Sequence, residues 1–370
     1  MNRHKLTITT SLLVFLVFPA ILSSAAAQTV STEDISITDL YSSIDSADVT
    51  LHSGAHHTDI TIDFELMLEG EVLRTERFEI NEALPDTDVT KVVSWDLKSP
   101  EDGFYITRMT LSMGGSVLDT RYHNFSYGSP ALPRVFIKDI IPDSRGVSII
   151  ISPYRTQFGT QAVLTDVEYM LVDGDTVIHR TRDPRVDVVQ TTPLSADWNV
   201  RLENNHPYSA RVKVKVPSQR QRDTVIARSV DFTAKDDARI TELYRDETGA
   251  SATVLGLSQV PFTGEIVFTV STDGETIEEI REKSPILMSD DDETTEVIWD
   301  NRLPAGMYEL SVKVIGNDGD VVDILETVIE AEEGRYVNVS QVPTPEKTPG
   351  FNIYQAAFAI MAIYLFRKDR

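Results

Sequence analysis

The stretch Tyr308-Glu309-Leu310-Ser311-Val312-Lys313-Val314, nine residues after Trp299, decides the fold. Its apolar side chains alternate with polar ones, and a period of two is typical of a β-strand with one face on a core and one face in water. A tryptophan followed by such a strand, which opens with tyrosine, occurs three times: Trp95 with Tyr105, Trp198 with Tyr208, and Trp299 with Tyr308. The tryptophans are 103 and 101 residues apart. The spacing indicates three copies of one unit.

Two further landmarks precede each tryptophan in the same order. An acidic-Gly-acidic turn lies 24 or 25 residues upstream, at Glu69-Gly70-Glu71, Asp173-Gly174-Asp175 and Asp273-Gly274-Glu275. Each unit opens with an Ile-x-acidic-Leu/Ile motif, at Ile37-Thr38-Asp39-Leu40, Ile137-Lys138-Asp139-Ile140 and Ile240-Thr241-Glu242-Leu243. Acidic-Gly pairs supply the positive φ that tight hairpins need, so each central turn is expected to join two strands.

The apolar residues before the turn alternate clearly in two of the three units. They are Ile60, Ile62, Phe64, Leu66 and Leu68 in the first unit, and Ile266, Phe268 and Val270 in the third. In the second unit Met170, Leu171 and Val172 run together, which predicts a bulge or a change of register there.

Short strands, regular turns and one tryptophan in each unit of about 100 residues predict an all-β fold of three tandem sandwiches, of immunoglobulin or fibronectin-III type. We place them at residues 28–130, 134–234 and 237–333. The tryptophans and the tyrosines that follow them are expected to lie in the cores. Because each tryptophan falls late in its unit, the strand topology stays open.

The connectors between the units are short. Residues 129–133, with two prolines, join the first unit to the second, and residues 235–238 join the second to the third. Short, stiff connectors favour separate modules in an elongated row over a compact cluster.

The N-terminus has the pattern of a secretory signal helix. Arg3 and Lys5 precede an apolar stretch at residues 12–22, and small residues with Ala25 and Ala27 at the expected cleavage positions follow. We predict a signal peptide at residues 1–27, with an uncleaved anchor as the alternative.

The C-terminus has the pattern of an anchor. A Thr/Pro linker at residues 334–348 leads to Pro349-Gly350-Phe351, an apolar run at residues 353–366 and a basic end at residues 367–370. The run spans roughly 21 Å as a helix, short against a bilayer core of roughly 30 Å. An apolar run of this length is enough for a tail that holds the chain in the membrane only until the tail is cut off.

Residues 349–370 resemble the PGF-CTERM sorting signal of archaeal surface proteins, over about 23 of the 370 residues. The resemblance implies cleavage near Pro349-Gly350-Phe351 by an archaeosortase, attachment to a membrane lipid and a surface-layer setting. Asn352, Tyr354 and Gln355 depart from the small apolar residues usual there, so a plain transmembrane helix remains the alternative. The body also resembles, in general pattern, repeated β domains of unknown function that accompany this signal.

Composition excludes one class of partner. The chain has 34 basic and 58 acidic residues, a net charge of −24, and loss of both end segments would make it more negative. Such a surface repels nucleic acid. There is no cysteine, so an exported chain of this kind must obtain its stability from apolar cores and without disulfides.

Few residues suggest ligand chemistry. His52, His56 and His57 could hold a zinc ion across a turn at Gly54, although they also suit a polar loop between strands. The acidic segments 289–293 and 317–320 could offer oxygen ligands to calcium, but we interpret them as solvated turns in preference to calcium-binding loops. Asn124 and Asn338 begin N-glycosylation sequons.

The sequence contains no phosphate-binding glycine loop, no Gly-x-Ser-x-Gly elbow and no His-Glu-x-x-His motif. We therefore expect a cell-surface structural or adhesive protein that is no enzyme and needs no cofactor. The rival interpretation is a surface protein that binds or hydrolyses carbohydrate. Exposed aromatic residues in a row on one sheet face would favour the rival.

Overall fold

The computed structural model describes residues 34–128, 134–154, 162–218 and 223–332. These residues contain 21 strands and no helix, in three groups of seven that we call repeats 1, 2 and 3. The all-β class predicted from the sequence is confirmed. The predicted signal helix and membrane helix lie outside the described residues.

The strands of each repeat have similar lengths in similar order. Repeat 1 contains β1 (Ile35–Ser42), β2 (Ser46–Ser53), β3 (His57–Leu68), β4 (Glu71–Ala83), β5 (Thr87–Ser94), β6 (Gly103–Met113) and β7 (Ser116–Tyr127). Repeat 2 contains β8 (Val135–Pro142), β9 (Gly146–Pro153), β10 (Val163–Asp173), β11 (Thr176–Val188), β12 (Thr192–Asp197), β13 (Pro207–Val216) and β14 (Thr224–Thr233). Repeat 3 contains β15 (Ala238–Arg245), β16 (Gly249–Gly256), β17 (Glu265–Thr272), β18 (Glu275–Lys283), β19 (Asp292–Ile298), β20 (Gly306–Ile315) and β21 (Val321–Ala331).

Each repeat forms a three-stranded and a four-stranded antiparallel sheet. In repeat 3 these are β15-β16-β19 and β18-β17-β20-β21, and repeats 1 and 2 use the equivalent strands in the same order. The fourth strand pairs with the third instead of the fifth, a topology that the sequence had left open.

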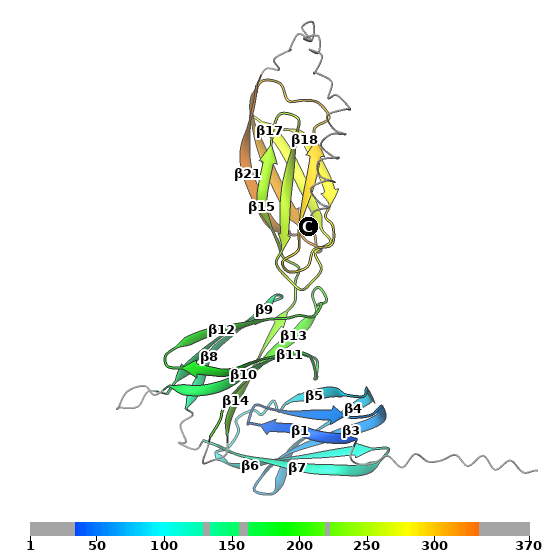
Figure 1. Cartoon of the computed structure of the whole chain (residues 1–370), viewed down its shortest axis with the longest axis vertical. Helices are drawn as coiled ribbons and strands as arrows, with labels where there is room; N and C mark the ends of the chain where they lie inside the picture. Colours follow the sequence, from blue (N-terminus) through cyan, green and yellow to red (C-terminus); the bar gives the residue numbers. More distant parts are fainter. Residues whose placement is uncertain (1–33, 129–133, 155–161, 219–222, 333–370) are drawn as a thin grey trace, which may run out of the picture. The chain divides into compact units, whose positions relative to one another are not determined.

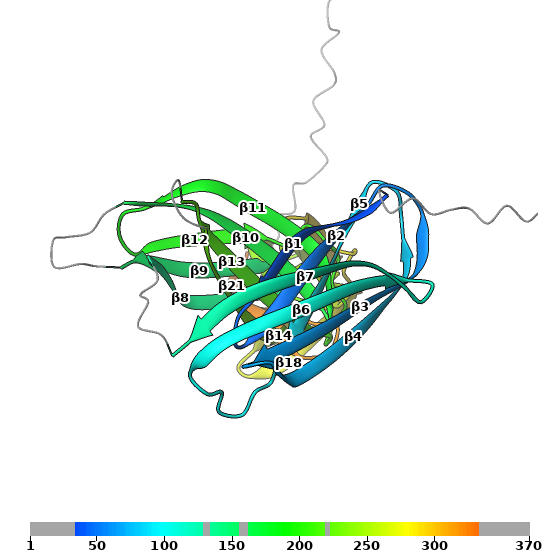
Figure 2. The same ribbon diagram turned by 90° about the horizontal axis from the view of Figure 1, so that it is seen from below.

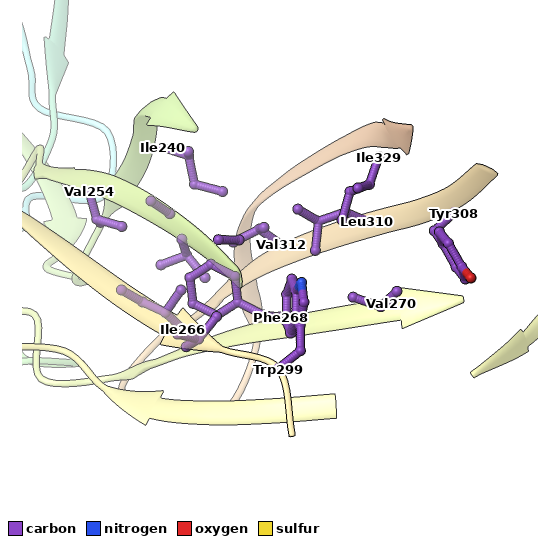
Figure 3. Close-up of a cluster of buried hydrophobic side chains, with 14 of the residues drawn as sticks. Ile240, Val254, Ile266, Phe268, Val270, Trp299, Tyr308, Leu310, Val312 and Ile329 are labelled. Carbon is purple, nitrogen blue, oxygen red and sulfur yellow. The ribbon is translucent and has the colours of Figure 1, made fainter. Parts of the chain in front are cut away.

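A buried tryptophan packs between the two sheets of each repeat. Trp95, Trp198 and Trp299 are all buried, and in repeat 3 the indole lies against Phe268 among aliphatic side chains from both sheets (Figure 3). Each indole nitrogen donates to a carbonyl in the turn after the first strand, over 3.1, 3.1 and 3.3 Å. This bond ties the end of the fifth strand to the same turn three times.

The tyrosine of each unit opens the sixth strand, and two of them close a tyrosine corner. The hydroxyl of Tyr105 donates to the carbonyl of Glu101 at 2.7 Å, and that of Tyr308 to the carbonyl of Pro304 at 2.9 Å. Such a bond fastens the loop between the fifth and sixth strands to the core edge. Tyr208 is buried at the equivalent position.

The Ile-x-acidic motif encodes a β-bulge. The register between the first and second strands shifts between Ile37 and Asp39, between Ile137 and Asp139, and between Ile240 and Glu242. A bulge leaves one residue unpaired and twists the strand. The motif therefore marks the same β-bulge in all three repeats. The alternation of apolar and polar residues did not predict this bulge.

The central hairpin turns differ between repeats. Glu69-Gly70 and Asp273-Gly274 lie between their strands with positive φ at both positions, as a type I′ turn requires. In repeat 2 the turn has moved by one residue, so that Gly174 and Asp175 lie between β10 and β11. The change of register predicted around Met170-Leu171-Val172 is present as a shift between Leu171 and Val172.

The expectation of separate modules in a row is wrong for the first two repeats. The described residues up to Arg201, together with Asn205–Ala234, form one compact unit, whereas Leu202–Asn204 and the described residues from Lys235 onward form another. The three-stranded sheet of repeat 1 continues into the four-stranded sheet of repeat 2, giving the order β1-β2-β5-β11-β10-β13-β14 (Figure 1, Figure 2). β11 lies beside β5, where Thr176 pairs with Lys91 and the amide of Val92 donates to the carbonyl of Asp175 at 2.8 Å. The expectation failed because it considered only the connectors and not the faces and edges of the folded repeats.

Candidate functional site: the charged contact between repeats 1 and 2

The outward face of β2 is polar and yet buried. Ser46, Asp48 and Thr50 alternate with core residues along this strand, and all three are covered. The covering surface is the outward face of β13, where Arg211 and Lys213 are buried as well. Two sheet faces that the residue pattern assigns to water therefore meet each other.

Asp48 is the centre of the contact. Its Oδ2 accepts from Nη2 and Nε of Arg211, at 2.6 and 3.1 Å, and its Oδ1 accepts from the ammonium of Lys213. The side chains of Arg211 and Asp48 are 0% and 1% exposed. Arg211 also donates to the hydroxyl of Ser46 at 2.8 Å, and Lys213 to Asp39 at 2.8 Å. The buried charges are thus paired and hydrogen-bonded, as burial requires.

The ionisation of Asp48 and Lys213 is coupled. Burial acts to raise the pKa of Asp48, but the positive charges of Lys213 and Arg211 together outweigh it and hold that pKa below its usual value. Burial acts to lower the pKa of Lys213, and the negative charges of Asp48 and Asp39 outweigh it and raise that pKa. Both side chains are therefore charged at neutral pH.

A second set of polar contacts extends the junction along β5. Arg180 donates to the hydroxyl of Thr50 at 3.0 Å and to that of Thr90. The ammonium of Lys91 donates to Asp175 and to Thr176, each at 2.7 Å. Lys91 and Thr176 are also the one paired position between β5 and β11. The edge-to-edge join is short, so side-chain contacts carry much of it.

Tyr41 closes one side of the junction. Lys213 Nζ lies 5.3 Å, and the guanidinium carbon of Arg211 5.9 Å, from the centre of its ring, within the range of cation–π attraction. Its hydroxyl accepts from the amide of Ala227 at 3.2 Å. Burial raises the pKa of Tyr41 and lowers that of His123, whose ring centre is 5.6 Å away.

A groove of about 460 Å³ runs beside the junction. It is lined by residues of both repeats, among them Asp39, Tyr41, His123, Arg182, Lys215 and Asp223. Arg182 pairs with Glu168 and Lys215 with Asp223, so these cations are already neutralised by the protein. The arrangement is suited to fixing the relation of two repeats, because breaking one buried charge pair leaves its partner stranded.

The structure does not bring the candidate zinc ligands together. His52 Nδ1 lies 2.9 Å from Asp88, and His56 Nε2 lies 2.8 Å from Glu82. His57 is buried, and its Nε2 has no hydrogen-bond partner. No cluster of three or more His, Cys, Asp or Glu that could hold a metal is present among the described residues.

Of the remaining predicted site residues, only Asn124 lies in the part of the chain that the structure describes. Asn124 is exposed on β7, with its side chain on the outward face. Ala25, Ala27, Asn338, Pro349, Gly350 and Phe351 lie outside the described residues. No helix in the described part of the chain has the length and apolar character needed to cross a membrane.

The charged junction was not predicted from the sequence. Arg211 and Lys213 occupy the polar half of an alternating strand, the pattern of a solvated face. One signal was available, namely the run Met170-Leu171-Val172, because a strand that is apolar on both faces must be covered on both. All three of these residues are buried.

Comparisons with known proteins give no family. No protein-family model matches the chain, and no curated protein matches it. Among solved structures, the chain is similar to the tetra-tandem repeat in the extending region of a large adhesion protein, with 9% identity, 80% of this chain and 74% of that chain covered, and a TM-score of 0.24.

Two further solved structures are similar at the same level. Fibronectin(III)-like modules of CbhA from Clostridium thermocellum show 16% identity, 55% of this chain and 96% of that chain covered, and a TM-score of 0.19. A DUF4785 family protein from Legionella pneumophila shows 9% identity, 80% and 89% coverage, and a TM-score of 0.25.

Proposed function

We propose that this chain is an exported cell-surface protein of structural or adhesive function, held to the membrane by its C-terminal segment and without enzymatic activity. Repeats 1 and 2 serve as one stiff element in it. The tail at residues 349–370 supplies the anchor, as a transmembrane helix or after exchange for a lipid by an archaeosortase. Envelope or surface-layer components are the proposed partners, and nucleic acid is not.

One observation carries the proposal, namely the join between repeats 1 and 2. A flexible tandem array needs no contact between its modules, but here a sheet continues across the boundary and Asp48 is buried between Arg211 and Lys213. Inter-domain motion is the default unless an interface is large and hydrophobic, so the stiffness proposed here depends on the buried charge pairs, which separation would leave stranded. A buried junction of this kind supports a role in which stiffness matters.

Single-molecule pulling on the full chain tests the stiffness. With handles at the two ends of the described region, we expect repeats 1 and 2 to extend as one unit, with no step for their separation before a sandwich unfolds. Asp48→Ala should add an early, low-force step, whereas Asp63→Ala, which removes an exposed pair with Arg77, should not. An early step in the unaltered chain would contradict the proposal.

Labelling of intact cells tests the location. An antibody against repeat 3 should stain cells that make the full chain, and deletion of residues 349–370 should move the signal into the medium. Mass spectrometry of the mature C-terminus separates the two anchors, since a protein that ends before Phe351 has been processed. A signal confined to the cytosol would refute export.

One observation favours carbohydrate binding as a second candidate. Phe104 and Tyr122 are 54% and 61% exposed and lie on the outward face of the β6–β7 pair, on either side of Asn124. Exposed aromatic rings on one face offer apolar surface to sugar rings. A glycan array with the full chain, and with Phe104→Ala and Tyr122→Ala, decides it, because binding that survives both changes does not use this face.

A further inference from the structure

Repeat 3 has a sheet face equivalent in register to the one that repeat 1 uses for docking, and within repeat 3 its central tyrosine is exposed. Both first strands have a bulge after the isoleucine, and Tyr41 pairs with Asp48 as Tyr244 pairs with Ser251. By the same register Glu242 occupies the position of Asp39. Position by position, the three-stranded face of repeat 3 therefore repeats that of repeat 1.

A pair of threonines makes the correspondence closer. The hydroxyls of Thr50 and Thr90 lie 2.9 Å apart on the face of repeat 1 that is covered by repeat 2, and those of Thr253 and Thr294 lie 2.8 Å apart in repeat 3. In both repeats the pair bridges the second and fifth strands.

The two faces differ in what covers them. Tyr41 is 7% exposed beneath Lys213 and Arg211, whereas Tyr244 is 68% exposed. Glu242 is exposed and, within the described residues, has no cationic partner. The edge of β5 pairs with β11, whereas the equivalent edge of β19 has no neighbour among the described strands.

The opposite sheet of repeat 3 carries the other half of the contact. Lys213 follows its tyrosine by five residues, and Lys313 follows Tyr308 by the same interval. β15 and β20 belong to the two different sheets of repeat 3, which pack against each other through the core, so the outer faces of these sheets point in opposite directions. The strands of repeat 3 are labelled in Figure 1. Lys313 has no carboxylate partner within the described residues, so its ammonium is available to one from outside.

The central charge pair is replaced on both sides at once. Where repeats 1 and 2 have Asp48 and Arg211, repeat 3 has Ser251 and Ser311. Ser311 is half-buried, and its hydroxyl, which is covered within its own repeat, has no hydrogen-bond partner among the described residues. A serine pair carries no charge, so none is left stranded at this position, and the attraction between the two faces then depends on Glu242 and Lys313.

We propose that the three-stranded face of repeat 3 in one copy docks onto the four-stranded face of repeat 3 in a second copy of this chain. Glu242 and Tyr244 of one copy receive Lys313 of the next, as Asp39 and Tyr41 receive Lys213. Ser251 and Ser311 occupy the central positions of the two faces. Because the two faces differ, the contact is heterologous and continues from copy to copy as an open row. It goes beyond the proposed anchoring and does not depend on it.

Charge reversal tests the pairing in the full chain, purified in detergent and followed by sedimentation velocity over a concentration series. The unaltered chain should associate. Glu242→Lys and Lys313→Glu should each weaken association roughly tenfold or more, because like charges then face each other. An equimolar mixture of the two variants should associate again, since each restores the opposite charge for the other. Circular dichroism confirms that both variants are folded.

Cysteine cross-linking tests the register, because the chain has no cysteine of its own. A mixture of Ser251→Cys and Ser311→Cys should yield covalent dimers with a bismaleimide cross-linker, which spans the gap that Arg211 fills between repeats 1 and 2, and the double variant should yield a ladder. Thr276→Cys, on β18, mixed with Ser251→Cys is the matched control and should stay monomeric. A monomeric unaltered chain would overturn the proposal, and so would association that neither charge reversal weakens. Cross-linking of the double variant only within one chain, with no dimer, would also overturn it.

Discussion

The four-stranded sheets of repeats 2 and 3 have the same strand order and yet different surroundings. In repeat 2, Arg211 and Lys213 on the outward face of β13 are buried against β2. In repeat 3 the equivalent residues are Ser311 and Lys313, and Lys313 is half-exposed and has no carboxylate partner among the described residues. The same sheet thus forms an internal joint in repeat 2, whereas in repeat 3 the two positions bury no charge pair.

The difference shows that alternation in a strand does not decide which face meets water. An outward-facing arginine is solvated when nothing covers it and becomes the centre of an interface when a complementary carboxylate does. Asp48 in repeat 1 supplies that carboxylate for repeat 2, and it is a single residue in a strand of otherwise ordinary polar composition. The identity of the covering face, and not the strand itself, sets the role of the sheet.

The largest effect is expected from the tryptophans, which both repeats share. Trp198→Ala and Trp299→Ala should each cost about 3–5 kcal/mol, because a buried aromatic side chain is lost and a cavity is left. Hydrogen exchange in the full chain should show faster exchange in repeats 1 and 2 for Trp198→Ala, and in repeat 3 alone for Trp299→Ala. If Trp198→Ala left repeat 1 unaffected, the two repeats would not be one cooperative unit.

Removal of Asp48 should give the clearest difference in stability between the junction of repeats 1 and 2 and the equivalent position in repeat 3. Asp48→Ala should destabilise repeats 1 and 2 by about 3 kcal/mol, because Arg211 and Lys213 are left buried without their main partner. Ser251→Ala, at the equivalent position of repeat 3, is the matched control and should change the stability of repeat 3 by less than about 0.5 kcal/mol. Urea unfolding, followed by exchange of the β13 and β20 amides, measures both. Equal effects would contradict the comparison.

Acid should act on the same carboxylate. The pKa of Asp48 is lower in the folded chain than its usual 3.8, so its stabilising contribution is complete above that pH and is lost as the pH falls through the lower folded value. We expect the stability difference between the unaltered chain and Asp48→Asn to be constant from pH 7 to about pH 4 and to shrink below it. Unfolding by urea at several pH values measures it, and a difference that shrinks already near neutral pH would contradict the assignment.

The smallest effect concerns a bond that repeats 1 and 3 have in common. Tyr105→Phe and Tyr308→Phe each remove one hydrogen bond to a loop carbonyl, at Glu101 and Pro304. The expected cost is about 1 kcal/mol in each repeat. Similar shifts in the two thermal transitions would support equivalent corners, whereas a shift in one alone would show that the other corner does not contribute to stability.

Much of the fold could be predicted from local patterns. Alternation gave the strands, the tryptophan and tyrosine spacings gave the repeats, and the acidic-Gly pairs gave the hairpins, because side-chain period and positive φ are properties of a few neighbouring residues. The bulge after Ile37 and its equivalents was present as a repeated motif, although its meaning was visible only from the strand pairing. The acidic surface followed from composition.

The junction could not be predicted in the same way. It depends on residues 163 positions apart, such as Asp48 and Arg211, and each alone is typical of a solvated strand face. The zinc hypothesis at His52, His56 and His57 had the same weakness, since spacing along the chain did not show that their partners would be Asp88 and Glu82. Pairing of distant polar groups is a property of the packed chain.

Local periodicity and turn chemistry are enough to predict three all-β units of similar length, their buried aromatic residues and the landmarks that bound them, because each depends on a few neighbouring residues. The tertiary structure alone decided that repeats 1 and 2 are one body. That outcome rests on the pairing of β11 with β5 and on the match of one buried carboxylate with two cations. Charge complementarity between faces exists only once both faces are folded.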